Sequence, residues 1–457
     1  MIGGRGVEEM PSGPKPWETA RGAAEFPLAD WFLRALILIG ICGIFYYIFA
    51  VRVYQPLLHS AEKHHWAGFL VRPSILWALM GVLMLCFRTL LWFSYRPKPA
   101  ADMRTAPAMT VIIPAYNEGA MVAKTIASVA AAKYPRDRLE IVVIDDGSKD
   151  DTWEHIEGAV ARCADRVTTV RFPQNRGKRA ALEEGFHRAR GEVVVTIDSD
   201  SEIDSDTLLA IAGPFRDPKV GAVAGKVLVH NRRSGVIPRM LHVRFILSFD
   251  FLRSAQSTYG TVYCCPGALS AYRTSVVREV LPFWREQKFL GVECTYGEDR
   301  ALTNFILGEG YDSVYQGTAR VRTLVPENYG KLCRMYLRWD RSYIREEIRF
   351  ARIVWKRPPV KALIAALDVT ITNLRYPVGY ATMALLAVFA VDDPTTILRV
   401  LSAMGIMTSL NMLYYLRSEL SWDFLFGIFY AYFSFFTLFW IFPYALLTVR
   451  SRSWLTR

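Results

Sequence analysis

The chain has few cysteines and histidines, and it lacks the spacings that hold structural metals. It contains seven of each among 457 residues, with no Cys-x-x-Cys pair and no His-Glu-x-x-His motif. These absences argue against a disulfide scaffold and against the common zinc sites. We therefore expect the polar part of the chain to keep its thiols reduced, as proteins do in the cytosol.

Glycine-rich nucleotide loops are also missing. No Gly-x-Gly-x-x-Gly follows the first predicted strand, and no Gly-x-x-x-x-Gly-Lys-Ser/Thr sequence occurs. Dinucleotide binding and P-loop hydrolysis are therefore disfavoured. A phosphate group would have to be bound through a metal ion that carboxylates hold.

Long apolar segments, in contrast, are abundant. Hydrophobic residues make up 52% of the chain and are concentrated near its two ends. About 20 apolar residues span the hydrocarbon of a bilayer, and five segments reach this length: residues 31–51, 73–95, 362–391, 396–416 and 423–449. Residues 1–26 are rich in glycine, proline and charge, so we expect a flexible tail there rather than a signal peptide.

These segments raise a question of topology. Two N-terminal crossings followed by three C-terminal ones would put the last residues across the membrane from the polar segment. Either residues 362–375 lie in the membrane interface, or the last segment turns back near Pro443. Charged residues in or near the spans favour a polar cavity between helices, although those near span ends can also reach the interface: Arg34, Arg88, Asp368 and Arg375.

The net charge is +12, and basic residues cluster beside the membrane segments. Lys and Arg at such positions mark the cytosolic face and bind anionic headgroups. Two clusters show this placement: Arg349, Arg352, Lys356, Arg357 and Lys361, then Arg450, Arg452 and Arg457. We therefore expect the lipid bilayer as the partner of this charge, and no nucleic acid.

The polar middle segment alternates between predicted strands and helices. Strands are predicted at residues 109–114, 139–144, 167–171 and 193–197, with helical stretches after the first two. This order predicts a mostly parallel sheet with helices on both faces. In such sheets ligands bind beyond the carboxyl ends of the strands, and two acidic clusters follow directly after strands there: Asp145-Asp146 and Asp198-Ser199-Asp200.

The acidic clusters suggest metal and carboxylate chemistry. An Asp-x-Asp puts two oxygen ligands on one side of an extended segment, and Mg²⁺ or Mn²⁺ takes such ligands. Alone this triplet is weak evidence, since most such triplets are solvated turns. Transfer of a sugar from a nucleotide diphosphate further needs a base, cations for the diphosphate and an aromatic platform. The candidates are Asp299 as base, Asp198 and Asp200 as metal ligands, Lys178 and Arg338 as cations, and Trp339 as platform.

The motifs together resemble the processive family 2 glycosyltransferases. They are Val111-Ile112-Ile113-Pro114-Ala115-Tyr116-Asn117-Glu118, Asp145-Asp146-Gly147-Ser148, Asn175-Arg176-Gly177-Lys178-Arg179, Asp198-Ser199-Asp200, Gly297-Glu298-Asp299-Arg300 and Arg338-Trp339. The resemblance is nearest to hyaluronan synthases. It is carried there by Arg253-Ser254-Ala255-Gln256-Ser257, Phe289-Leu290-Gly291, Thr295-Tyr296-Gly297, Leu302-Thr303-Asn304 and a terminal Trp454-Leu455-Thr456-Arg457.

The resemblance implies an inverting transferase with a GT-A fold that polymerises UDP-sugars and passes the polysaccharide through its own membrane helices. It implies Mg²⁺ or Mn²⁺ at Asp198 and Asp200, with Asp299 as the catalytic base. Donor or polymer contacts would come from Tyr116, Glu118, Asp146, Lys178, Asp198, Arg338, Trp339, Trp454 and Arg457. The acceptor would lie against Cys264, Gly267 and Glu298.

The expected organisation follows from this resemblance. The tail (1–26) precedes two transmembrane helices (27–103), a cytosolic GT-A domain (104–330), amphipathic interface helices (331–360) and a C-terminal transmembrane region with the gating motif (361–457). The expected partners are UDP-GlcNAc and UDP-glucuronic acid, the growing polysaccharide and the bilayer.

The sequence departs from the family's motifs at two places, and it leaves several alternative functions open. Met335 stands where the family's Gln-x-x-Arg-Trp motif has Gln, and Cys265-Pro266-Gly267 replaces a Gly-Pro-Leu run. A chitin, chitooligosaccharide or cellulose-like synthase would use a single UDP-sugar. A lipid-carrier transferase or a transporter with an inactive cytosolic domain are further alternatives, and Trp339 could instead anchor a helix at the membrane interface.

Overall fold

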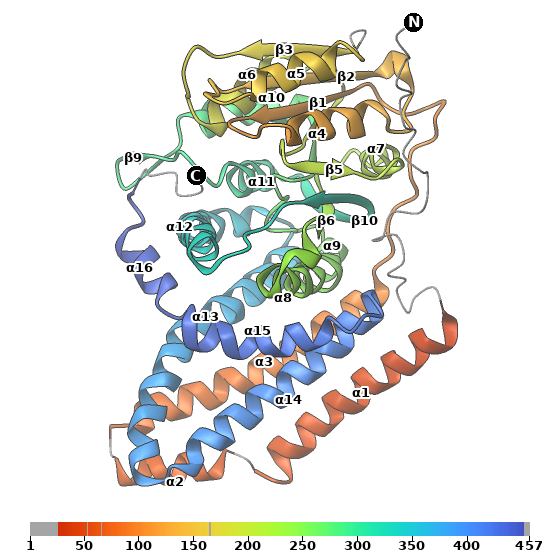
Figure 1. Ribbon diagram of the computed structural model, residues 1–457. Coiled ribbons are helices and arrows are strands. Elements are labelled where there is room, and N and C mark those ends of the chain that lie inside the picture. Colours follow the sequence, from red (N-terminus) through yellow and green to blue (C-terminus); the bar gives the residue numbers. More distant parts are fainter. Residues whose placement is uncertain (1–25, 53, 65, 164–165, 452–457) are drawn as a thin grey trace, which may run out of the picture.

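The computed structural model describes residues 26–52, 54–64, 66–163 and 166–451 (Figure 1). The predictions for the tail at 1–25 and for Trp454 and Arg457 lie outside this part of the chain. Figure 1 shows an α/β domain above a group of long helices. The polar middle segment and the apolar ends therefore form two layers of one molecule.

The α/β domain is built on an eight-stranded sheet with the order β3-β2-β1-β4-β7-β6-β10-β5. The strands are β1 (Met109–Ala115), β2 (Leu139–Asp145), β3 (Val167–Arg171), β4 (Val193–Thr196), β5 (Ser201–Ile203), β6 (Val220–Val229), β7 (Ser270–Arg273) and β10 (Asp312–Thr323). A short hairpin, β8 (Lys288–Phe289) and β9 (Val292–Glu293), is separate from it.

The predicted α/β fold is confirmed, although the sheet is mixed. Strands β3, β2, β1 and β4 are parallel, whereas β7 runs antiparallel to both of its neighbours and β5 antiparallel to β10. Residues 236–258, which are helical, connect β6 to β7, yet β7 lies antiparallel to β6, so this connection is not the crossover of a parallel strand–helix–strand unit. Every residue of β1 is buried, which fits its continuous apolar sequence and a strand covered on both faces.

Helices cover the sheet and connect it to the layer of long helices. Those of the α/β domain are α4 (Met121–Ala130), α5 (Thr152–Val160), α6 (Lys178–Arg188), α7 (Thr207–Ala212), α8 (Val236–Ile246), α9 (Ser254–Thr258), α10 (Thr274–Arg285) and α11 (Glu298–Gly308). A π-helical segment, η5 (Leu247–Arg253), joins α8 to α9. The predicted amphipathic segment forms α12 (Tyr329–Ile353), which packs between α11 and α16 and buries Arg341, Arg345 and Glu346.

Four helices in the described part of the chain are long and apolar enough to cross a membrane. They are α1 (Pro27–Phe49), α3 (Gly68–Ser94), α13 (Pro359–Asp392) and α14 (Thr395–Ser418), with the short α2 (Gln55–Lys63) between α1 and α3. The number rises to five if α15 (Phe424–Thr437) and α16 (Ile441–Leu447), which meet at 49°, are one broken span.

Both ends of the α15–α16 pair contact the α/β domain. At its start, the Asp423 carboxylate accepts a hydrogen bond from Arg232, which follows β6. Beyond its end, the Tyr296 hydroxyl donates to the Ser451 carbonyl at 2.8 Å. The final segment therefore returns to the side from which it started, and the break at residues 438–440 lies just before Pro443. Of the two expected topologies, the structure favours the one in which the last segment turns back.

Candidate active site

The acidic clusters lie at the ends of two strands on either side of β1 and at one helix start. Asp146 follows β2, Asp198 follows β4, and Glu298 and Asp299 form the first turn of α11. Gly297 precedes this turn with φ +74°, and a Cβ there would lie 1.8 Å from the Ser342 Oγ of α12. Glycine is therefore required where α11 begins against α12.

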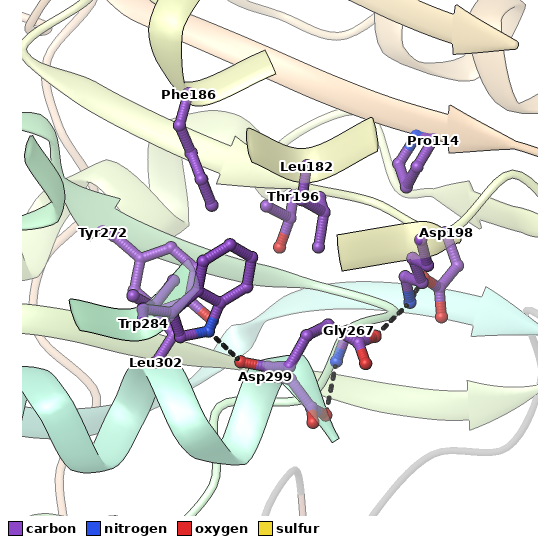
Figure 2. Close-up of a pocket in the computed structure, with 12 residues that line it drawn as sticks. Pro114, Leu182, Phe186, Thr196, Asp198, Gly267, Tyr272, Trp284, Asp299 and Leu302 are labelled. Carbon is purple, nitrogen blue, oxygen red and sulfur yellow. Dashed lines mark hydrogen bonds and ion pairs between the residues drawn. The ribbon is translucent and has the colours of Figure 1, made fainter. Parts of the chain in front are cut away.

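A small cavity brings five of the predicted site residues together (Figure 2). Its volume of about 10 Å³ is close to that of one water molecule. Figure 2 shows the Gly267 backbone beside the Asp299 carboxylate, with Asp198 approaching from another strand end. The lining residues are Pro114, Lys178, Leu182, Phe186, Thr196, Asp198, Gly267, Tyr272, Trp284, Glu298, Asp299 and Leu302.

Lys178 links the acidic clusters electrostatically. Its Nζ lies 2.5 Å from Asp198 Oδ1 and 3.1 Å from Glu298 Oε1. Burial disfavours the ammonium, but the two carboxylates outweigh it, so the pKa of Lys178 is raised. Burial likewise opposes ionisation of Glu298, yet Lys178 and Arg338 lower its pKa to about 2. Lys178 and Glu298 are therefore both charged near neutral pH.

Asp299 has different surroundings from its neighbour. Its Oδ2 accepts hydrogen bonds from the Gly267 backbone N–H at 3.1 Å and from the Cys264 thiol at 3.7 Å. Its Oδ1 accepts one from the Arg300 N–H at 2.7 Å. Burial, and then the negative charge of Glu298, raise the pKa of Asp299. A carboxylate with a raised pKa is a stronger proton acceptor, which suits a general base.

Asp146 organises the loop that leads into α6. Its two carboxylate oxygens accept hydrogen bonds from the backbone N–H groups of Arg176 at 2.7 Å and Gly177 at 2.8 Å. Burial raises its pKa, and these two hydrogen bonds oppose the rise. Gly147 permits the close approach, because a Cβ there would lie 2.5 Å from the Gln174 carbonyl carbon. Asp146 thus positions the segment that carries Lys178, and direct donor contact stays a prediction.

Tyr116 and Glu118 lie in the loop after β1, beside the loop after β2. The Glu118 backbone N–H donates to Thr152 Oγ1 at 2.8 Å, and Lys149 N–H donates to Asn117 Oδ1 at 2.9 Å. These hydrogen bonds fix the two loops to each other at the carboxyl ends of parallel strands, where ligand binding is expected. The roles of Tyr116 and Glu118 in donor binding stay predictions.

Asp200 has the chemistry of a metal ligand. Its Oδ1 accepts hydrogen bonds from Thr323 at 3.0 Å and Ser201 at 3.2 Å. Burial, and then the charge of Asp198, raise its pKa, so the two carboxylates are close enough to repel each other. Within the described ranges no group of three or more His, Cys, Asp or Glu side chains is placed to hold a metal ion. Two carboxylates still suit Mg²⁺ or Mn²⁺, whose remaining ligands are water and phosphate.

Trp339 and Met335 lie on α12 among buried side chains. The Trp339 ring lies 5.6 Å from Tyr336 and 6.3 Å from Phe245, and the Arg244 guanidinium is 5.7 Å from it. Trp339 therefore packs between α12 and α8. Met335, at the position of the family's Gln, is buried in the core of the α/β domain.

The last residues that the structure describes are hydrogen-bonded to α12 and to the loop before α11. Thr448 accepts hydrogen bonds from Arg341 at 2.9 and 3.1 Å, and Tyr296, three residues before Asp299, binds the Ser451 carbonyl. Sequence reasoning did not identify these anchors or the Thr323 contact to Asp200. They join residues more than 100 positions apart, and no local motif marks them.

Comparison with known proteins agrees with the geometry. The family model "Glycosyl transferase family 2" matches residues 110–281. The chain is 32% identical to an N-acetylglucosaminyltransferase of Azorhizobium caulinodans over 359 residues, which cover 77% of this chain and 87% of that protein. It is 33% identical to a hyaluronan synthase of Streptococcus pyogenes over 288 residues, 62% of this chain and 68% of the synthase.

A solved structure shows the same fold. It is the mannosyltransferase PcManGT from Pyrobaculum calidifontis in complex with GDP-Man and Mn²⁺, with a TM-score of 0.56 and 22% identity, covering 76% of this chain and 96% of that one. This likeness supports the GT-A architecture of the α/β domain. In the sequence, long apolar helices precede and follow its GT-A domain. The chain therefore belongs to glycosyltransferase family 2, whose members transfer sugars from nucleotide sugars.

Proposed function

We propose that the protein is a membrane-embedded, processive, inverting β-glycosyltransferase that polymerises UDP-sugars into a polysaccharide and passes it through its membrane helices. The observation that carries the proposal is the convergence of Lys178, Asp198, Glu298 and Asp299 at one cavity of a GT-A domain. The four apolar helices beside this domain support a location in the cell membrane. The basic residues next to those helices support a site on the cytosolic face.

Asp299 is the base in this proposal. The acceptor hydroxyl oxygen forms a bond to the anomeric carbon while the bond from that carbon to the diphosphate breaks. The hydroxyl proton goes to Asp299, and UDP leaves with the electron pair. The hydrogen bonds from Gly267 and Cys264 orient the Asp299 carboxylate for this transfer, and burial favours proton uptake.

The cations and the carboxylates near the strand ends would bind the donor. Lys178 and Arg338 would stabilise the diphosphate, because both are cationic. Both lower the pKa of Glu298, whose carboxylate lines the cavity. Asp198 and Asp200 would hold Mg²⁺ or Mn²⁺, which supplies positive charge against the leaving diphosphate when bound. Trp339 would present its ring to a sugar of the acceptor chain, and Trp454 and Arg457 would close over the nucleotide.

The identity of the sugars is proposed from the relatives. Similarity to a hyaluronan synthase supports UDP-GlcNAc together with UDP-glucuronic acid as donors and a hyaluronan-like product. Similarity to an N-acetylglucosaminyltransferase over a larger share of the chain favours a second candidate, a chitooligosaccharide made from UDP-GlcNAc alone. Both candidates use the same transfer chemistry at Asp299.

One incorporation experiment separates these candidates. Membranes containing the protein are incubated with radiolabelled UDP-GlcNAc and UDP-glucuronic acid, singly and together, with and without EDTA. Polymer formed only with both donors supports the hyaluronan-like product, and polymer from UDP-GlcNAc alone supports the second candidate. EDTA is expected to abolish incorporation, and added Mg²⁺ or Mn²⁺ to restore it. A single sugar added to a lipid, or no incorporation from any UDP-sugar, would contradict processive synthesis.

A further inference from the structure

A buried ion pair joins two of the membrane helices where they meet the GT-A domain. Arg88 of α3 donates from Nε to Asp368 Oδ1 of α13 at 2.6 Å and from Nη2 to Thr372 Oγ1 at 2.5 Å. Asp368 is only 3% exposed. A charge buried among apolar helices is costly unless it is paired and hydrogen-bonded. The sequence marked both residues as unusual, and the structure shows that they are partners.

The second oxygen of Asp368 points to the GT-A domain. The hydroxyl groups of Tyr263 and Tyr259 donate to Asp368 Oδ2 at 2.9 and 3.3 Å, and they lie 3.0 Å from each other. The Tyr263 hydroxyl is also 3.3 Å from the Ala365 carbonyl. Asp368 therefore fixes two side chains that belong to the polar domain, more than 100 residues away in sequence.

The segment that carries these tyrosines continues to the proposed base. Residues 259–267, which we name the bridging loop, begin with Tyr259 and end with Gly267, whose N–H donates to Asp299 Oδ2. Cys264, directly after Tyr263, donates its S–H to the same oxygen. One loop of nine residues thus contacts Asp368 at its start and Asp299 at its end.

The segment that leads into α13 contacts the bridging loop at a second point. Arg357 donates to the Gly260 carbonyl at 2.9 Å and to Asp312 Oδ1 at 2.6 Å. Lys361, on the first turn of α13, donates to Asp312 Oδ2 at 2.7 Å. Residues of the GT-A domain hold the rest of the loop: Arg253 donates to the Cys264 carbonyl, the Cys265 N–H donates to Thr303 Oγ1, and Ser313 Oγ donates to the Val262 carbonyl. The contacts with α13 therefore act on the first part of the loop, at Tyr259, Gly260 and Tyr263.

We propose that Asp368 is a positioning residue for sugar transfer, acting through Tyr263 and the bridging loop on Asp299. The inference rests on the proposed role of Asp299 as base. The loop donates two hydrogen bonds to one oxygen of the Asp299 carboxylate, and such bonds orient the carboxylate and favour its ionised form. Arg88 pairs with one oxygen of Asp368 and the two tyrosines donate to the other, and hydrogen bonds to a carboxylate are stronger than those between neutral groups.

The test uses two conservative variants of the full-length protein. Tyr263→Phe removes the hydroxyl but keeps the ring, which packs 5.1 Å from Phe350. Asp368→Asn keeps the shape of the side chain but removes its charge. Each is expected to lower kcat about tenfold, the usual effect of one lost charge-assisted hydrogen bond, with the KM for the donor within about twofold of the parent.

The pH dependence provides a readout that a purely structural role would not change. Lys178, Glu298 and Arg300 keep their places beside Asp299 in both variants. Only the donors from the bridging loop are displaced, so the pKa of Asp299 rises. The acid side of the pH–rate profile should move to higher pH in Tyr263→Phe and in Asp368→Asn.

Asp30→Asn is the matched control. Asp30 of α1 pairs with Arg417 of α14 and with Arg34, each at 2.7 Å, and its side chain is 15% exposed, against 4% for that of Asp368. It should lower thermal stability while leaving kcat and the pH–rate profile at the parent values. If Asp30→Asn shifted the profile as much as Asp368→Asn, the effect would be general and the inference overturned.

Two further outcomes separate this inference from the proposed function. If the folded Tyr263→Phe and Asp368→Asn proteins keep both kcat and the pH–rate profile of the parent while Asp299→Asn is inactive, the positioning role is wrong and the base assignment stands. If Asp299→Asn is fully active, the base assignment itself fails. If Asp368→Asn does not fold, kcat and the pH–rate profile of Tyr263→Phe alone test the positioning role.

Discussion

Glu298 and Asp299 are neighbours in the chain, but the structure gives their carboxyl groups opposite properties. Glu298 is held ionised by Lys178 and Arg338, with its pKa lowered to about 2, whereas burial and the charge of Glu298 raise the pKa of Asp299. Two carboxyl groups whose environments move their pKa values apart can take different roles in one reaction. We assign the proton acceptor role to Asp299 and the binding role to Glu298.

The first prediction concerns this pair. Glu298→Gln removes the negative charge beside Asp299, so the pKa of Asp299 falls and the base stays ionised to lower pH. The acid side of the pH–rate profile should therefore shift to lower pH, the direction opposite to that expected for Tyr263→Phe. Initial rates of sugar transfer measured across pH test this. An unchanged profile would show that Asp299 does not control the acid side.

At the scale of elements, the start of α11 depends on Gly297. Its φ of +74° is unfavourable for other residues, and an added Cβ would collide with Ser342 of α12. Gly297→Ala should therefore displace Glu298 and Asp299 and lower activity by at least about 100-fold, the usual cost of a misplaced reacting group.

Gly310→Ala is the control for this prediction. Gly310 has φ +89° with nothing within 4 Å of an added Cβ, so the substitution introduces backbone strain alone. It should cost about 1 kcal/mol of stability and leave transfer unchanged. Thermal unfolding and initial rates of both variants check the pair, and equal loss of activity in the two would contradict a specific role for Gly297.

Elements with strong local patterns could be predicted from the sequence. The β-branched runs before Asp145 and Asp198 form β2 and β4, and the apolar segments form long helices. The antiparallel direction of β7 could not be predicted, and the return of the last segment is one of two topologies between which the sequence could not choose, because each depends on contacts with distant segments. The link from Asp368 to Tyr263 belongs to the same class, since neither residue lies in a recognisable motif.

At the scale of the whole molecule, the GT-A domain and the membrane helices are joined by polar contacts rather than by a flexible linker. Asp368, Asp312 and Asp423 each pair with a basic side chain across this boundary or beside it. Such buried pairs hold one relative orientation of the two layers. This rigidity suits the proposed passage of a polysaccharide from the site into the helices.

The topology gives a prediction at this scale. Pro394 lies between α13 and α14, whereas Trp422 lies between α14 and α15, next to Asp423 and its contact with Arg232. Both positions are exposed. In intact cells a membrane-impermeant thiol reagent should label the Pro394→Cys protein above the level of the parent. The Trp422→Cys protein should be labelled above that level only after the cells are permeabilised. Equal labelling of both before permeabilisation would contradict four crossings.

The most direct test of the central claim is the transfer rate of purified Asp299→Asn. Initial incorporation of radiolabelled GlcNAc from UDP-GlcNAc is measured beside the parent, and UDP binding is measured on the same samples. The account predicts a rate lower by at least about 100-fold, as expected for loss of a general base, with UDP binding preserved. Polymerisation at the parent rate would contradict the assignment of Asp299 and the mechanism built on it.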